Sequence, residues 1–207
     1  MSALMPEAKR PLRNRVNPFG EIVATPERGM FMGNRGCLHD ANRQIVRHAA
    51  RDAWITCLPR WPGIRRQLMR PGHYTELFFL DEATSLAAGH RPCASCRPER
   101  WRAFRLAWQR AHDLNLPPKV AEVDAVLGEE RGRLVPFEDN APVDGLMVTD
   151  AARSGVRMWR GGEWWKWSFA GYEAATPPAG PLKQVTPPAV VATMLAGYDA
   201  YIGAAAG

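Results

Sequence analysis

Residues 86–98, LAAGHRPCASCRP, contain the pattern on which the predicted fold depends. Cys93 and Cys96 stand three positions apart, after one proline and shortly before another, Pro98. A C-x-x-C pair directs two thiolates toward one point, which suits a tetrahedral zinc ion with each sulfur about 2.3 Å from the metal. A redox motif would require a thioredoxin-like βαβ context, which is missing here, and plain burial of unliganded thiols is a third alternative. We therefore predict a zinc site that includes both cysteines.

The other ligands of this site must come from distant parts of the chain. The simplest set adds the two remaining cysteines, Cys37 and Cys57, and four thiolates would form a closed, structural zinc site. His39, two residues after Cys37, is an alternative ligand, and one cysteine would then be a core residue or a reactive thiol. No second C-x-x-C pair exists, so spacing does not decide between these sets.

The residues on either side of the thiol pair have clear helix and strand signals. The apolar run at 74–80 predicts a strand, and Asp81 is suited to cap a short helix that Gly89 closes. A longer helix is expected after Pro98, because proline is favoured in the first turn. Its apolar side chains recur with a helical period and predict one buried stripe, made of Trp101, Phe104, Trp108 and Ala111.

The rest of the chain predicts an α+β protein. Residues 30–58 read as short strands around turns, residues 120–133 as a helix, and residues 134–170 as β structure with a hairpin at Gly161 and Gly162. A C-terminal helix is expected with Thr186 as its N-cap.

We predict three parts of the chain. Residues 1–29 form a basic N-terminal arm. Residues 30–115 form a small zinc domain made of a short sheet, a helix, the cysteine pair and a helix, and residues 116–207 form a small β-hairpin unit with a C-terminal helix.

The charge of the chain is uneven. The net charge is +6, but residues 1–70 hold 13 Lys and Arg against 5 acids, while residues 112–150 hold 3 basic and 9 acidic groups. A localised basic surface is typical of proteins that bind polyanions, and phosphate contacts by arginine would make DNA the expected partner. The candidate nucleic-acid-binding residues are Arg35, Arg43, Arg47, Arg51, Arg65, Arg66, Arg91, Arg97 and Arg100.

Residues 78–101, FFLDEATSLAAGHRPCASCRPERW, resemble the end of the zinc-binding domain of the bacterial Ada DNA alkylation-repair proteins. The matching pattern is an alanine-rich helix followed by RPC, two residues, a second cysteine and a basic segment, and it comprises Ala83, Ala87, Ala88, Gly89, Arg91, Pro92, Cys93, Cys96, Arg97 and Pro98. The resemblance implies a zinc domain that contacts DNA in repair or damage sensing. That family has an upstream C-x-x-x-C pair, one thiolate of which accepts a methyl group, and this chain has no such pair, so the acceptor role is not transferred to any residue.

We therefore expect a zinc-stabilised DNA-binding protein, with a role such as DNA repair or damage sensing. One alternative is a metal-dependent nuclease or other nucleic-acid-modifying enzyme that uses His39 and Asp40 beside the metal. Another is a structural zinc module for protein partners. The first 20 residues lack the apolar core of a secretory signal, and no run reaches the length of a membrane span, so we expect a cytoplasmic protein with no membrane partner.

Overall fold

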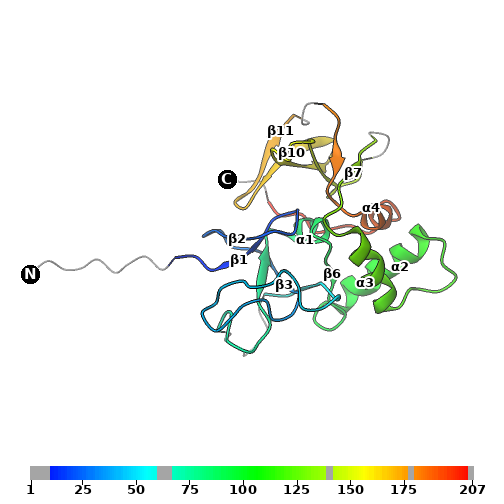
Figure 1. The fold of residues 1–207 in the computed structure, drawn as a ribbon. Helices are drawn as coiled ribbons and strands as arrows, with labels where there is room; N and C mark the ends of the chain where they lie inside the picture. Colours follow the sequence, from blue (N-terminus) through cyan, green and yellow to red (C-terminus); the bar gives the residue numbers. More distant parts are fainter. Residues whose placement is uncertain (1–9, 60–66, 139–141, 177–179, 205–207) are drawn as a thin grey trace, which may run out of the picture.

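Two sheets and four helices make up the described part of the protein. The computed structural model describes residues 10–59, 67–138, 142–176 and 180–204. Within them, each sheet has six strands, in the orders β2-β1-β5-β3-β4-β6 and β11-β10-β9-β8-β12-β7 (Figure 1). The mixed α and β content agrees with the predicted class. No helix of these residues is both long and apolar enough to cross a bilayer.

The first sheet is built from short strands of the N-terminal half. Its strands are β1 (Arg13–Val16), β2 (Ile22–Ala24), β3 (Phe31–Asn34), β4 (Ile55–Cys57), β5 (Leu77–Phe79) and β6 (Arg91–Pro92). The expected arm at 1–29 thus contributes a hairpin, because β1 pairs with β2 and also lies parallel to β5. Val16 and Ile22 are buried in one cluster with Leu77 and Phe79 of β5, and these contacts anchor the hairpin.

Helix α1 (Glu82–Ala87) lies between the two sheets (Figure 1), and all six of its residues are buried. Asp81 caps it as predicted, because the carboxylate accepts a hydrogen bond from the Thr84 N–H at 2.8 Å. Ala83 and Ala87 pack against residues of the second sheet. Small side chains allow a sheet to approach closely, and α1 is therefore the element that the two sheets share.

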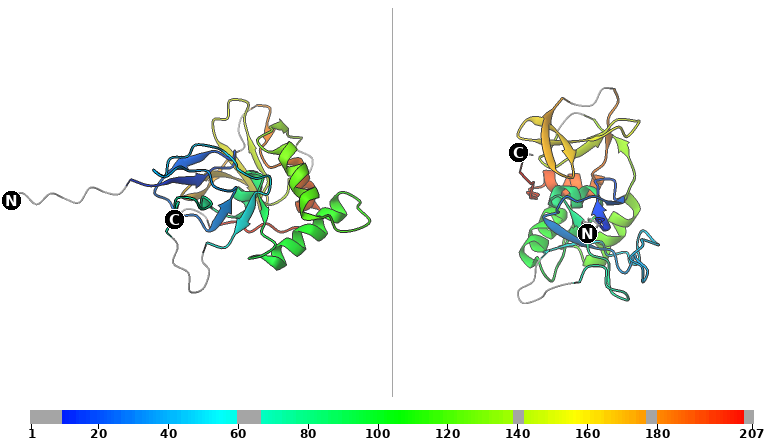
Figure 2. Two further views of the ribbon diagram at one scale, coloured as in Figure 1. Left: turned by 60° about the horizontal axis from the view of Figure 1, so that its bottom comes forward. Right: turned by 90° about the vertical axis from the view of Figure 1, so that its left-hand side faces the viewer.

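The remaining helices pack together beside the sheets (Figure 2). They are α2 (Pro98–Ala111), α3 (Val120–Glu130) and α4 (Pro188–Leu195). The aromatic residues of the predicted α2 stripe are buried, and they meet Val123 and Leu127 of α3 and Val190 of α4 in one core. Ala111, at the end of the helix, is only half-buried. Helix α4 begins after Pro187, slightly later than expected from Thr186.

The second sheet contains the predicted hairpin. Its strands are β7 (Val135–Pro136), β8 (Met147–Thr149), β9 (Val156–Arg160), β10 (Glu163–Ser168), β11 (Gly171–Ala175) and β12 (Lys183–Gln184). Gly161 and Gly162, with φ of 59° and 87°, form the turn between β9 and β10. Trp165 and Trp167 pack toward the core that includes α1, whereas Trp164 packs on Leu146 in a separate cluster.

Candidate metal centre

Two parallel strands bring Cys57 and Cys93 together. Cys57 is the last residue of β4, and Cys93 directly follows β6. The strands pair in register, Thr56 opposite Pro92, and the N–H of Cys93 donates to the carbonyl of Thr56 at 3.0 Å. The ends of neighbouring parallel strands lie at the same edge of a sheet, so two thiols that are far apart in sequence become neighbours.

Cys96 joins them through a tight turn between β6 and α2. The N–H of Arg97 donates to the carbonyl of Cys93 at 3.0 Å, which folds the four residues back on themselves. Backbone N–H groups of Ser95 and Cys96 donate to the Cys93 sulfur, and that of Leu58 donates to the Cys96 sulfur. Such donors stabilise negative charge on sulfur, which is the form that binds a metal.

The three sulfurs fit one ion. They lie within 4.8 Å of one another, and a tetrahedral zinc with Zn–S bonds near 2.3 Å would separate its sulfurs by about 3.8 Å. Cys57 and Cys93 are buried, and Cys96 is half-buried. Among the described residues, no other cysteine, histidine or carboxylate belongs to this group. These three cysteines could therefore hold a metal ion.

The electrostatics of the group favour a thiolate at Cys93. The hydrogen bond from Cys57 lowers the pKa of Cys93 to about 4, against the opposing effect of burial, and the N–H groups of the turn act in the same direction. The same hydrogen bond, together with burial, raises the pKa of Cys57. Burial also raises the pKa of Cys96, although the Leu58 N–H partly offsets it. Because the three thiols are so close, the ionisation of each depends on the other two. A bound cation would favour the loss of all three thiol protons.

Cys37, His39 and Asp40 have other partners. The Cys37 thiol is directed to the carbonyl of His39, at 3.7 Å. The His39 ring is buried, with Nδ1 at 2.6 Å from the Thr75 hydroxyl and Nε2 at 3.2 Å from the Arg70 carbonyl. Asp40 accepts the N–H groups of the turn that follows it. The structure thus brings three of the four predicted cysteines together, but it does not bring Cys37, His39 or Asp40 to them.

Three of the predicted DNA-binding arginines are buried, and a fourth, Arg100, is half-buried. Arg91 pairs with Asp124, and both Arg97 and Arg100 pair with the buried Glu82. Arg35, the residue that directly follows β3, is also buried. The buried Arg35, Arg91 and Arg97 are therefore not available for contacts with DNA phosphates, whereas Arg100 is paired with Glu82 but only half-buried.

The other five candidates lie elsewhere. Arg43, Arg47 and Arg51 are exposed on the loop between β3 and β4, and none of the three forms a salt bridge with another described residue. Arg65 and Arg66 lie outside the described residues. The exposed basic surface of the described N-terminal half therefore includes residues 43–51.

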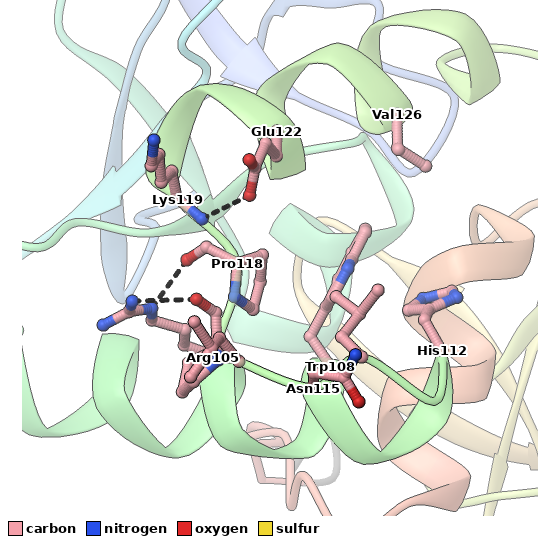
Figure 3. Close-up of a pocket in the computed structure, with 11 residues that line it drawn as sticks. Arg105, Trp108, His112, Asn115, Pro118, Lys119, Glu122 and Val126 are labelled. Carbon is pink, nitrogen blue, oxygen red and sulfur yellow. Dashed lines mark hydrogen bonds between the residues drawn. The ribbon is translucent and has the colours of Figure 1, made fainter.

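A separate apolar groove lies between the end of α2 and the start of α3 (Figure 3), with a volume of about 780 Å³. Its Arg105 guanidinium donates to the carbonyls of Pro117 and Pro118, at 2.9 and 2.6 Å. The backbone N–H of Lys119 donates to Glu122, at 2.7 Å, so this carboxylate is used in capping α3. The groove is distinct from the cysteines, and these polar groups are already paired.

Comparison of the chain with protein-family models, with curated protein sequences and with solved structures finds no match. The metal centre must therefore be judged on its own geometry. The N–H donors that surround the sulfurs were not predicted, and the only sequence signal for them is the C-x-x-C turn itself.

Proposed function

We propose that this chain is a zinc protein in which Cys57, Cys93 and Cys96 bind one Zn²⁺ ion. The observation that carries the proposal is the convergence of three sulfurs, with backbone N–H groups directed at two of them. Thiolate ligands select zinc, Cu(I) or iron–sulfur clusters over hard cations. Iron–sulfur clusters are usually held by four cysteines, whereas three thiolates and one further ligand are an ordinary zinc site. The resemblance of residues 78–101 to an Ada-type zinc domain supports the same choice.

The ligand count suggests a fourth coordination position that the protein does not fill with sulfur or nitrogen. The residues that the structure does not describe include neither cysteine nor histidine. A zinc ion with three protein ligands and one exchangeable position is typical of catalytic rather than closed structural sites. Chemistry at this position would not involve His39, because both nitrogens of its ring already have partners.

Metal stoichiometry tests the zinc proposal. The wild-type protein, reconstituted with zinc and dialysed, should retain one zinc per chain by elemental analysis. The Cys57→Ser, Cys93→Ser and Cys96→Ser variants should each retain much less, whereas Cys37→Ser should bind as the wild type does. A wild-type protein that retains no zinc would overturn the proposal, and so would a loss in Cys37→Ser equal to that in Cys57→Ser.

Cobalt substitution tests the fourth position separately. Co²⁺ bound by three thiolates should give a sulfur-to-metal charge-transfer band and tetrahedral visible bands. Added imidazole should shift the visible bands if the fourth ligand exchanges. If the charge-transfer band is present but the visible bands do not respond to imidazole, the fourth ligand does not exchange. The zinc site would then be closed and structural.

A second candidate function is DNA binding through the exposed loop arginines, as expected for a zinc protein of DNA repair or damage sensing. The observation that favours it is the exposure of Arg43, Arg47 and Arg51 with no salt bridge to a described residue. Such unpaired charges are free to displace counterions from phosphates.

Binding to duplex DNA at several salt concentrations tests this function. Replacing the three loop arginines with alanine should weaken binding and reduce the salt slope by about 0.9 for each phosphate that is no longer neutralised. The matched control replaces three exposed arginines that lie elsewhere, Arg28, Arg102 and Arg133. No measurable binding by the zinc-loaded protein would favour a structural zinc module for protein partners.

A further inference from the structure

Arg35 is a fully buried guanidinium with no carboxylate partner among the described residues. Its Nε donates to His90 Nε2 at 3.1 Å, and its Nη1 donates to the carbonyl of Gly20 at 2.9 Å and lies 3.0 Å from His48 Nε2. Its Nη2 is buried and has no hydrogen-bond partner. A buried charge without an opposite charge is costly, and neutral partners offset only part of that cost.

A second cation stands close to the first. The guanidinium carbons of Arg35 and Arg131 lie 3.8 and 4.5 Å from the centre of the same indole ring, that of Trp54. Arg131 donates from Nε to the Gly89 carbonyl at 3.1 Å, and its Nη2 is buried without a hydrogen-bond partner. Burial, and then the charge of Arg131, lower the pKa of Arg35 to about 9. The two arginines repel each other, and an anion beside them would relieve that repulsion.

A pocket opens beside this pair. Its volume is about 280 Å³, and its walls include Phe19, His48, Trp54 and Arg131. Arg51 and Asp52 line it as well, and Arg35 lies directly behind the wall that His48 and Trp54 form. Asp52 and the carbonyl end of α3 oppose an anion. Asp124 also acts on Arg131, but its charge is balanced by its ion pair with Arg91. Arg35, Arg51 and Arg131 then outweigh Asp52, so the local charge is positive.

We propose that this pocket binds the phosphate group of a small phosphate monoester, held by His48 and Arg131 in the positive field of Arg35. The volume is slightly below that of pockets for drug-sized ligands, and it therefore suits a phosphate with a few attached atoms. Arginine recognises phosphate through paired, charge-assisted hydrogen bonds. The site is separate from the zinc centre and does not depend on it.

Calorimetric titration of the zinc-loaded full chain with inorganic phosphate tests the proposal, at constant ionic strength set with chloride. We expect saturable binding, and a loss of affinity of about tenfold or more in Arg131→Gln, because a charged hydrogen bond is removed. Arg133→Gln is the matched control, since Arg133 is exposed two residues further along and should bind phosphate normally. Acetate should bind more weakly than phosphate, and equal affinity would overturn the assignment to phosphate.

A second variant covers the case in which Arg131→Gln fails to fold. The His48 side chain is partly exposed, so His48→Ala should fold and still lose phosphate affinity. Further titrations distinguish the sources of the phosphate. One uses a nucleoside 5′-monophosphate, and another compares a short DNA strand that carries a 5′-phosphate with the same strand without it. Preference for either source supports the site. No phosphate binding by the wild type, or unchanged affinity in both variants, would overturn it.

Discussion

The side chains of Arg91 and Asp124 form a buried ion pair with two parallel hydrogen bonds, Nε to Oδ1 and Nη2 to Oδ2, both at 2.8 Å. Arg91 belongs to β6, two residues before Cys93, and Asp124 belongs to α3. The guanidinium carbon of Arg91 also lies 4.9 Å from the centre of the Trp101 ring of α2. The strand that positions the thiols is therefore fixed by two helices.

Replacing Asp124 with alanine should destabilise the protein strongly. The change leaves the Arg91 guanidinium buried without its counter-charge, which typically costs about 3–5 kcal/mol. Urea denaturation should show this loss in the free energy of unfolding, whereas Glu129→Ala, an exposed change on the same helix, should cost little. Equal, small effects of the two changes would contradict the structural role of the pair.

Tyr198→Phe should lower stability by about 1.5–3 kcal/mol, the usual range for a hydrogen bond to a charged group. The Tyr198 hydroxyl donates to the buried Glu82 carboxylate at 2.7 Å, and thereby joins the C-terminal segment to α1. Tyr201→Phe is the matched control, because the Tyr201 side chain is 49% exposed and only the backbone N–H of this residue reaches Glu82. Thermal unfolding should separate the two variants clearly, and a similar shift in both would argue against the hydrogen bond.

Local signals explain the parts of the fold that the sequence predicted. The cap at Asp81, the proline at the start of α2 and the aromatic stripe that begins with Trp101 each act within a few residues. Residues 30–58 are predicted to contain short strands, but the part around Ile45 makes only an isolated bridge with His39. Its strand-forming side chains find no long partner, so propensity alone was insufficient.

Non-local pairing explains what the sequence left open at the site. Cys57 reaches Cys93 because β4 and β6 are parallel neighbours, and no sequence pattern fixes that register. The burial of arginines could not be predicted from the sequence for the same reason. Arg91 is buried because it pairs with Asp124, which is 33 residues away. Composition predicted a basic surface, but it could not distinguish an internal ion pair from a free side chain.

The buried His90 should make stability fall in acid. Burial, followed by the charges of Arg35 and Arg131, holds the pKa of His90 well below its usual value. Below about pH 6.5 the unfolded chain therefore binds a proton that the native protein does not, and the free energy of unfolding falls with decreasing pH by up to about 1.4 kcal/mol per pH unit. His90→Gln keeps an acceptor for Arg35 and should flatten this slope below about pH 6.5, where only the unfolded chain gains the proton. An unchanged slope in urea titrations would contradict the buried neutral imidazole.

Removing zinc should destabilise the wild-type protein and the Cys37→Ser variant equally. A metal that binds only the native state stabilises it by about 2.7 kcal/mol when free zinc exceeds the dissociation constant about 100-fold, and a chelator removes this contribution. Cys57→Ser should not respond to the chelator, because it lacks one of the three converging sulfurs. Thermal unfolding with and without chelator measures the difference for all three proteins. A chelator effect in Cys57→Ser as large as that in Cys37→Ser would place the stabilising metal somewhere other than between β4 and β6.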